Sequence, residues 1–542
     1  MHQTCWIGNG LFFCGLIVTA SFSWASDWPT YRHDVARSGV TSDEVASTLH
    51  RQWTYVAPHA PKPAWPEPGR ELNRLAFDYA YAVTIAGGRV YFGSSADHKV
   101  YAIRLDTGQP CWSFFTEGPV RFAPTISEGR VFVASDDGWL YCLSATDGKL
   151  LWRFYGGARD ERILGNGQMI SRWPLRSGVA VDRGIVYFSA GMWPSEGVFL
   201  YALDAETGAV IWRNDTSGVD YRDLPHPGSN AVTGVSPQGI LLANRSQLFV
   251  PTGRNVPAAY DRETGKLLYY HSQPTTWGDR WGGTWCMLVG RLLFNWRTHV
   301  APDIDVRLGE AEPDPNDGIV AFDAETFELK RDFPGKLCAV VAGKTLYATG
   351  RGKVTAYDFE AWAAGAKPTD CMKWETPHGR AYSLILAGKT LAVGGRGTVT
   401  LIAADTGRVV WRDTVDGQVR SLAAADGRLL ASTTDGQILC YGPDQLPTPR
   451  VHQSQPDAKA LASGPNSQTA AATARQILQT SGQKEGYALV LGAGDGRLLY
   501  QLAAQSNLTI YCLEPDADRV ARVRRALAPS FTACGSPFTT EL

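Results

Sequence analysis

The sequence predicts an all-β body, an eight-bladed β-propeller of four-stranded blades, followed by a truncated α/β segment. Two observations predict the propeller. A phrase of one strand, an Asp-containing turn and a second strand recurs along the chain, and the composition is rich in Gly and Trp, with little amphipathic-helix pattern before residue 470. A third observation predicts the α/β segment, because a strand, a glycine-rich loop, a helix and a second strand follow one another after residue 486.

The charge composition excludes one class of partner. Lys and Arg together number 52 against 53 for Asp and Glu, and no long run of one sign occurs. A nucleic-acid-binding protein concentrates basic residues on one face or in one segment. Nucleic acid is therefore not an expected partner.

The N-terminus predicts export. An apolar run over residues 11–20 is followed by Ser23-Trp24-Ala25, which places small residues where signal peptidase cleaves. We expect a signal peptide over residues 1–25, a mature chain from Ser26 in the periplasm or cell envelope, and no transmembrane span after cleavage. The alternative is an uncleaved anchor. The ten cysteines contain no metal-type CxxC pair and assign no disulfide.

The recurring phrase defines the body. Four strong copies end in Trp, and four weaker copies bring the count to eight; the copies lie at residues 101–112, 141–152, 201–212, 400–411, 258–269, 320–326, 355–358 and 438–441. Each copy is preceded by two further strand-like runs, such as residues 82–85 and 89–92. Asp-Gly and Thr-Gly supply the turn, because Gly accepts positive φ. A four-stranded unit repeating about every 40 residues is typical of a propeller blade.

The blade count predicts how the ring closes. The last copy, residues 438–441, runs into Gly442-Pro443 without a final Trp strand. Residues 51–56 have the required apolar alternation and a Trp, so we expect them to complete blade eight. We expect Trp112, Trp152, Trp212 and Trp411 to pack one blade against the next. The propeller is thus assigned to residues 26–442, with loop insertions in blades three to five.

The repeat, together with the opening Asp27-Trp28-Pro29-Thr30-Tyr31-Arg32-His33-Asp34 and Arg37-Ser38-Gly39, resembles the quinoprotein alcohol dehydrogenase-like superfamily. It is most similar to the non-enzymatic PQQ-like repeat proteins of that superfamily, over roughly residues 27–442. This resemblance implies a binding or scaffold module in the cell envelope. Since one fold carries many functions, it implies little about activity.

A pyrroloquinoline-quinone-dependent dehydrogenase is the alternative within the same superfamily. Its members commonly carry a vicinal Cys-Cys disulfide over the quinone, a Ca²⁺ ion and an Asp base. This chain has no Cys-Cys pair, and none of its acidic residues maps onto the metal or base positions. We therefore do not expect the quinone to bind, and we name no catalytic or metal-ligating residue in the propeller.

The inserted loops supply the candidate ligand-binding residues. Loops at the mouth of a rigid ring carry function more often than its strands do, and aromatic and cationic side chains gather in those of blades three to five. The candidates are Arg172, Trp173, Trp193, Trp281 and Trp285. They predict a protein or small-molecule ligand at the propeller mouth. The alternative is that they fill the channel and pack the inserted loops.

The C-terminal part changes character. Residues 443–469 are rich in Pro, Gln, Ser and Ala and predict a linker. Residues 470–542 then predict a partial Rossmann-like segment with a helix over 470–479, a strand over 487–491, a helix over 497–505, a strand over 508–513 and a helix over 516–527. As it stands, this segment lacks the further strands that would cover its apolar sheet edge.

The glycine loop of this segment predicts a cofactor site. Gly492, Gly494 and Gly496 follow the first strand, and Glu514 ends the second. The arrangement resembles the first half of a class I S-adenosylmethionine-dependent methyltransferase. The resemblance implies that the three glycines border the methionine moiety of S-adenosylmethionine and that Glu514 holds its ribose. Val490 departs from that family, which has an acidic residue there, and a dinucleotide site is the alternative for the same spacing.

Two functional hypotheses follow for the whole chain. In the first, an exported binding or scaffold propeller is fused to an incomplete methyltransferase-like domain. In the second, the complete protein is a methyltransferase whose substrate the propeller selects.

Overall fold

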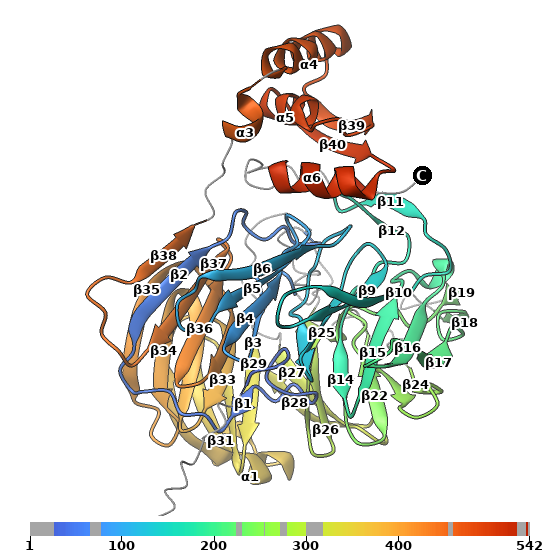
Figure 1. Ribbon diagram of the computed structural model, residues 1–542. Helices are drawn as coiled ribbons and strands as arrows, with labels where there is room; N and C mark the ends of the chain where they lie inside the picture. The colour runs from blue at the N-terminus through green and yellow to red at the C-terminus, as the bar shows by residue number, and fades with distance from the viewer. Residues whose placement is uncertain are drawn as a thin grey trace, which may run out of the picture.

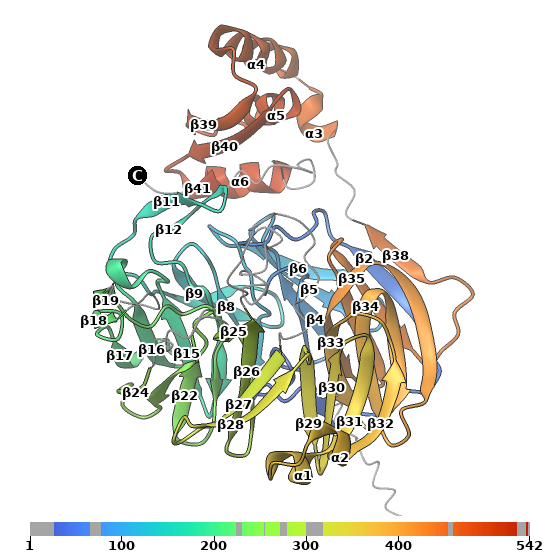
Figure 2. The same cartoon turned by 180° about the vertical axis from the view of Figure 1, so that it is seen from behind.

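The computed structural model describes residues 27–65, 77–223, 230–253, 255–270, 279–299, 318–453, 459–464, 466–527 and 538–539. The predicted signal peptide lies outside these residues. The described chain is mainly β-structure arranged as a propeller-like body of sheets that stand side by side, with a smaller α/β unit at one end of it (Figure 1). The reverse view in Figure 2 shows the same arrangement.

Six four-stranded antiparallel sheets make up most of the described body, and each takes its strands in chain order. The six sheets are formed by β3 (Val83–Ala86), β4 (Arg89–Gly93), β5 (Lys99–Arg104) and β6 (Pro110–Phe115); β7 (Thr125–Ser127), β8 (Arg130–Ala134), β9 (Trp139–Ser144) and β10 (Leu150–Tyr155); β14 (Ala180–Asp182), β15 (Ile185–Ala190), β16 (Phe199–Asp204) and β17 (Val210–Asn214); β21 (Leu242–Ala243), β22 (Gln247–Val250), β23 (Ala258–Asp261) and β24 (Leu267–Tyr269); β25 (Asp279–Val289), β26 (Leu292–His299), β27 (Gly318–Asp323) and β28 (Leu329–Pro334); and β29 (Cys338–Ala342), β30 (Thr345–Gly350), β31 (Lys353–Asp358) and β32 (Met372–Pro377).

The remaining strands of the body join in one eight-stranded sheet, in the order β1 (Val40–Thr41), β33 (Ala381–Ala387), β34 (Thr390–Ala403), β35 (Val409–Ala425), β36 (Arg428–Thr433), β37 (Gln437–Gly442), β2 (His50–Val56) and β38 (Arg450–Gln453). The long strand β35 connects the two halves of this sheet, because its first half pairs with β34 and its second half with β36.

The core of the body lies between neighbouring sheets. Strands alternate, so one face of β5 presents Val100 and Ala102 to the next sheet, where they meet Tyr141 and Leu143 of β9. All four side chains are nearly or fully buried. Apolar residues on both faces of a middle strand are therefore explained by packing on two sides.

The N-terminal strand β2 joins the last sheet, as the sequence predicts. It pairs antiparallel with β37, with Arg51 opposite Tyr441 and Thr54 opposite Leu439. The indole of the buried Trp53 then crosses to the first sheet and donates a hydrogen bond to the carbonyl of Leu105, at 2.9 Å. Residues 51–56 thus connect the last sheet to the first.

The same contact recurs between other sheets. Trp112, Trp152 and Trp212 each donate an indole hydrogen bond to a carbonyl in the turn of the following sheet, at 3.0–3.1 Å. Each ring covers the glycine of that turn. For Trp53 the covered residue is Gly108, where φ is +75° and an added Cβ would lie 2.7 Å from the indole. The predicted sheet-to-sheet packing of these Trp residues is confirmed, whereas Trp411 contacts Tyr441 edge-on.

The segment over residues 28–41 closes one end of the body. Trp28 bridges to Ile85 in β3, the buried Arg37 donates to the carbonyls of Val179 and Leu241, and Gly39 accepts from Leu386 in β33. These partners belong to innermost strands, or to their immediate approach, in four different sheets. A single segment therefore ties together sheets that are far apart in the sequence.

Shorter elements are inserted between the sheets. They are the hairpin of β11 (Arg162–Gly165) and β12 (Gln168–Ser171), the hairpin of β18 (Asp220–Asp223) and β19 (Asn230–Thr233), the parallel pair β13 (Ser177–Gly178) and β20 (Gly239–Ile240), the 3₁₀ turn η2 (Pro194–Glu196), and the helices α1 (Phe359–Ala363) and α2 (Pro368–Cys371). Both hairpins fall in the region where the sequence predicts insertions.

The C-terminal unit has parallel topology. It contains α3 (Lys459–Ala462), α4 (Ser467–Ser481), β39 (Glu485–Leu491), α5 (Arg497–Ala504), β40 (Asn507–Leu513), α6 (Ala517–Leu527) and β41 (Phe538–Thr539), and its sheet order is β39-β40-β41. Leu499, Leu502, Ile510 and Val520 form its core, so the unit has an apolar cluster of its own. The order of helix, strand, helix, strand and helix from α4 to α6 matches the prediction from the sequence, whereas α3 and β41 were not predicted.

The predicted linker is not entirely irregular. Within residues 443–469, strand β38 adds to the last sheet parallel to β2, and α3 begins at Lys459. His452 Nε2 lies 2.7 Å from the carbonyl of Thr107. Backbone pairing at a sheet edge needs no apolar side chains, which is why composition alone gave no sign of this strand. Among the described helices, none has both the length and the apolar character needed to cross a bilayer.

Candidate functional site

The two ends of the body differ in chemistry. At the end closed by residues 28–41, the innermost strands finish and turn back. At the opposite end, which we call the entry end, the chain enters the innermost strands of each sheet, and the C-terminal unit lies on this side (Figure 1). The buried charged side chains of the first three sheets gather at the entry end.

Four of these residues form one network, which we call the charge cluster: Asp78, Arg121, Asp136 and Arg176. Arg121 contacts the carboxylates of Asp78 and Asp136, each at 2.6 Å, and Arg176 contacts the other oxygen of Asp136 at 2.7 Å. The four side chains are at most 3 % exposed. Asp78 precedes β3, Arg121 precedes β7 and Arg176 precedes β13, so the cluster ties three consecutive parts of the body together.

Burial and ion pairing compete within the charge cluster. Burial disfavours ionised Asp136, but two guanidinium groups outweigh it and hold its pKa below the ordinary value. Asp78 has one such partner, and there burial prevails and raises the pKa. Arg121 Nη2 and Arg176 Nη1 are both buried without a hydrogen-bond partner among the described residues. Such donors are costly unless water or a ligand accepts from them.

The hairpin β11–β12 covers the charge cluster. Asn166 in its turn accepts a hydrogen bond from Arg176 Nη2 at 2.8 Å. Gln168 Oε1 lies 2.5 Å from Nε2 of the buried His98, whose pKa burial lowers to about 4. The hairpin is thus held by polar side chains of the body.

Three of the five predicted ligand-binding residues lie close together near this hairpin. Arg172 follows β12 and lies between Glu196, at 2.6 Å from its Nε, and Glu161, at 2.9 Å from its Nη1. The Trp173 ring is buried in an apolar core cluster and donates to the carbonyl of Glu196. Trp193, beside η2, is 36 % exposed. Of these three, Trp193 presents the most accessible aromatic surface.

The other two predicted residues lie elsewhere. Trp285, in β25, is half-buried and lies beneath the guanidinium of Arg32, 5.6 Å from its ring centre. Arg32 belongs to the segment over residues 28–41, so the Trp285 ring lies near that segment and not beside Trp193. Trp281 also lies in β25, and its side chain is outside the described residues.

The structure brings the predicted glycine loop and Glu514 together. Gly492, Gly494 and Gly496 all have positive φ, between +56° and +85°. A Cβ at Gly492 or Gly494 would meet no atom within 4 Å, whereas one at Gly496 would lie 3.1 Å from Val523. The first two glycines therefore leave an open surface above the loop, and the third permits close packing of α6.

Glu514 serves the loop directly. Its carboxylate accepts from the backbone N–H of Ala493 at 2.9 Å and that of Asp516 at 3.1 Å, and it contacts Arg519 at 3.1 Å. The hydrogen bond from Ala493 and that from Asp516 lower its pKa. The side chain is 2 % exposed. In this arrangement Glu514 anchors the loop, and a ribose would have to compete with these donors.

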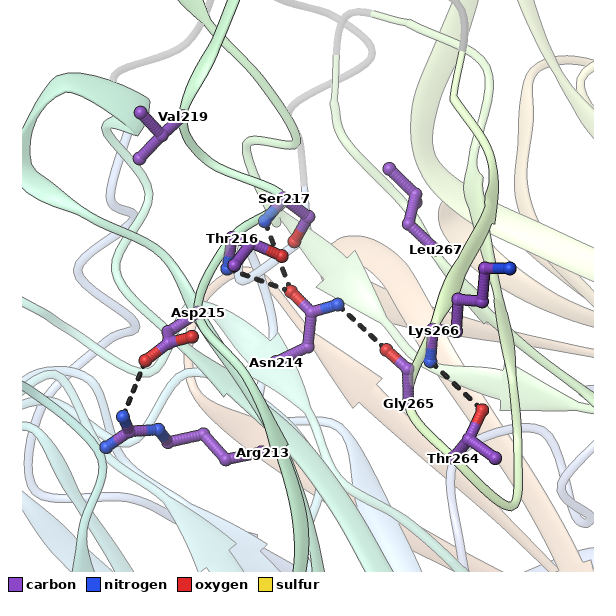
Figure 3. Close-up of a pocket in the computed structure, with 10 residues that line it drawn as sticks. All are labelled: Arg213, Asn214, Asp215, Thr216, Ser217, Val219, Thr264, Gly265, Lys266 and Leu267. Atoms are coloured by element: carbon purple, nitrogen blue, oxygen red, sulfur yellow. Dashed lines mark hydrogen bonds and ion pairs between the residues drawn. The ribbon is translucent and has the colours of Figure 1, made fainter.

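A further depression lies on the outside of the body, between β17 and the turn before β24 (Figure 3). It has a volume of about 360 Å³ and is lined by Arg213, Asn214, Asp215, Thr216, Ser217, Val219, Thr264, Gly265, Lys266 and Leu267. Its polar groups satisfy one another: Asn214 donates to the carbonyl of Gly265 and accepts from the backbone of Thr216 and Ser217. None of the predicted site residues lines it.

The quinone and its calcium ion, which the sequence does not lead us to expect, stay a prediction for this chain. No group of three or more His, Cys, Asp or Glu side chains is placed to hold a metal ion in the described ranges. The acids of the charge cluster are already committed to Arg121 and Arg176.

The charge cluster is the feature that sequence reasoning missed. Arg121 and Arg176 are separated by 55 positions, and no motif singles out either one. A signal was nevertheless present, because both stand two residues after a proline that leads into an innermost strand, as Pro119-Val120-Arg121 and Pro174-Leu175-Arg176. Aligning the blade repeats at this position would have shown the equivalence.

Comparison with known proteins identifies the repeat. The profile of the family described as outer membrane protein assembly factor BamB matches residues 52–173, 166–278 and 360–522. The BamB of Nitrosomonas eutropha is 30% identical over 189 residues, which cover 32% of this chain and 41% of that protein. The tetrathionate hydrolase of Acidithiobacillus ferrooxidans is 25% identical over 177 residues, 31% of this chain and 30% of that one. In both cases the match spans less than half of the relative.

Two solved structures share the fold. The quinohemoprotein alcohol dehydrogenase ADHIIG of Pseudomonas putida superposes with a TM-score of 0.50 at 14% identity, over 84% of this chain and 85% of that one. A europium-containing methanol dehydrogenase superposes with a TM-score of 0.50 at 12% identity, over 75% and 90%. At such identities the likeness establishes the propeller fold of the quinoprotein dehydrogenases and nothing about activity.

Proposed function

Because the chain belongs to the family of outer membrane protein assembly factor BamB, we propose that it is an exported scaffold propeller that binds a protein partner in the cell envelope. We further propose an eight-bladed ring, in which β35 contributes to two blades and β2 completes the last.

The observation that carries the proposal is the contrast between the two ends. Residues 28–41 occupy one end, whereas the entry end carries the charge cluster, with two buried arginine N–H groups that find no partner in the part of the chain that the structure describes. Trp193 and Arg172 lie by the hairpin that covers this cluster. Aromatic and arginine side chains are the residue types that dominate protein interfaces. The entry end is therefore the binding end in this proposal.

Site-specific photo-cross-linking in intact cells tests this assignment. A benzophenone amino acid is placed at Trp193 and, as the control, at Lys389, an exposed position beside Glu44 at the closed end. We expect a discrete protein adduct from position 193 in the envelope fraction and none from position 389. Equal adducts from both positions, or adducts from position 389 alone, would refute the assignment. A small-molecule ligand would give no protein adduct and would also contradict a protein partner.

A second function is proposed for the C-terminal unit, as a site for an adenosine-bearing cofactor, with S-adenosylmethionine the first candidate. The open surface above Gly492 and Gly494 favours it, since a cofactor approaches the backbone closely where no side chain intervenes. When bound, S-adenosylmethionine would supply a methyl group. The three glycines would hold the cofactor, and Glu514 would keep the loop in position. In this version the propeller selects the methyl acceptor.

A further inference from the structure

The C-terminal unit is joined to the body by more than its connecting chain. Arg524 of α6 forms an ion pair with Glu117, 2.7 Å apart, and both side chains are largely buried, at 12 % and 14 % exposed. The same guanidinium lies 5.4 Å from the ring centre of Phe115 at the end of β6. Charge-assisted contacts that are shielded from water are the stronger class of hydrogen bond.

A second contact lies on the sheet of the C-terminal unit. The backbone N–H of Met169 in β12 donates to the hydroxyl of Tyr511 in β40, at 2.7 Å. Tyr511 is nearly buried, and burial raises its pKa to about 12, so the hydroxyl stays neutral. Figures 1 and 2 show the hairpin β11–β12 beneath the C-terminal unit from opposite sides. The unit therefore rests on the body at two separate points.

Both points lead directly into the charge cluster. The backbone N–H of Glu117 is held by the carboxylate of Asp137 at 2.8 Å, next to Asp136. The residue before Met169 is Gln168, which contacts His98, and two residues further back Asn166 accepts from Arg176. Gln168 thus contacts the body through its side chain, while the backbone N–H of the next residue, Met169, donates to the C-terminal unit.

We propose that the C-terminal unit is a cap on the entry end, and that the hairpin β11–β12 couples its docking to the arrangement of Arg176 and His98. Docking holds the hairpin against the charge cluster, and an ordered cluster in turn presents Met169 to Tyr511. Coupling of this kind is reciprocal, so a change on either side must alter the other. Docking of the C-terminal unit would thereby regulate the binding end, and this proposal rests on the proposed function.

Hydrogen exchange of the full-length protein, without ligand, tests the docking half. Tyr511→Phe removes the hydroxyl that accepts from Met169, and we expect exchange of the Met169 amide to become about tenfold faster. Tyr487→Phe is the matched control, because Tyr487 stacks on Tyr511 in the same sheet but is 52 % exposed. For the ion pair with Glu117, hydrogen exchange within α6 is compared between Arg524→Gln and Arg525→Gln, since Arg525 is an exposed arginine in the next position. Equal exchange in variants and controls would overturn the cap.

The proposed coupling between the hairpin and the C-terminal unit is tested by a substitution in the body alone. Asn166→Gly removes the acceptor of Arg176 and the donor to the carbonyl of Ala64 but none of the contacts to α6, and glycine keeps the positive φ of this turn without strain. If the hairpin only folds locally, exchange within α6 stays as in the unchanged protein, and the coupling is refuted. We expect instead that α6 exchanges faster, in the same direction as in Arg524→Gln. No ligand enters these measurements, so their failure leaves the cross-linking result standing, and the converse also holds.

Discussion

Replacing Trp53 by Ala tests whether the N-terminal strand holds the last sheet to the first. Trp53 is fully buried, its ring covers Gly108, and its indole donates to Leu105 at 2.9 Å. Truncating a buried Trp costs about 3–5 kcal/mol through lost burial and the remaining cavity. Trp53→Phe keeps most of the ring but leaves the Leu105 carbonyl without its donor, which costs about 1–2 kcal/mol.

The assay is urea unfolding of the mature chain, followed by circular dichroism. The control is Trp193→Ala, which removes a Trp that is 36 % exposed, and it should change the free energy of unfolding by no more than about 0.5 kcal/mol. The expected order of destabilisation is Trp53→Ala, then Trp53→Phe, then the control. If Trp53→Ala costs no more than the control, residues 51–56 do not hold the two sheets together.

Three further predictions concern protonation and cofactors. Burial lowers the pKa of His98 to about 4, so its neutral form stabilises the fold above pH 6.5, and this stabilisation is lost as the pH falls towards 4. Between pH 6.5 and 5, the free energy of unfolding of His98→Gln should therefore fall by about 2 kcal/mol less than that of the unchanged protein, as measured by urea unfolding. Calorimetry with a version of the C-terminal unit extended by further strands should detect S-adenosylhomocysteine in preference to NAD, and Glu514→Ala should weaken that binding by releasing the loop from its anchor; binding of NAD alone would contradict the assignment. The body given pyrroloquinoline quinone and Ca²⁺ should not retain the quinone after gel filtration, and stoichiometric quinone absorbance would revive the dehydrogenase hypothesis.

The sequence predicted the body well because its information is local and repeated. Each copy of the phrase carries its own turn glycine and its own apolar alternation, so a weak signal in one copy is supported by the others. The pairing of β2 with β37 was predictable for the same reason, since a copy without its Trp strand requires one from elsewhere. The C-terminal element order was equally readable from a strand, a glycine loop and a helix.

The parts that could not be predicted depend on contacts between distant positions. Trp374 makes the same indole contact as the predicted Trp residues, to the carbonyl of Ala404, but it follows a helical insertion that hides the phrase. Strand β38 pairs through its backbone and leaves no apolar pattern. The charge cluster joins residues up to 98 positions apart, between Asp78 and Arg176, and no local pattern reports an ion pair.

The predicted ligand-binding residues do not all lie in one part of the body. Arg172, Trp173 and Trp193 are neighbours in space, whereas Trp285 packs near Arg32 of the N-terminal segment. All of them belong to regions rich in aromatic residues, but the position of a residue along its strand or loop decides which end of the body it lies near. Glu514 likewise lies at the end of the second strand, as expected. Its carboxylate, which the resemblance assigns to a ribose, accepts a hydrogen bond from the glycine loop.

The central claim, that the entry end is the binding end, is tested most directly by Arg176→Lys in the protein that carries the photo-cross-linker at position 193. The substitution keeps a positive charge beside Asp136 but removes the Nη1 donor, which has no partner among the described residues, together with the Nη2 hydrogen bond to Asn166. We expect a several-fold lower yield of the adduct, with the circular dichroism spectrum unchanged. An undiminished yield from a folded Arg176→Lys protein would contradict it.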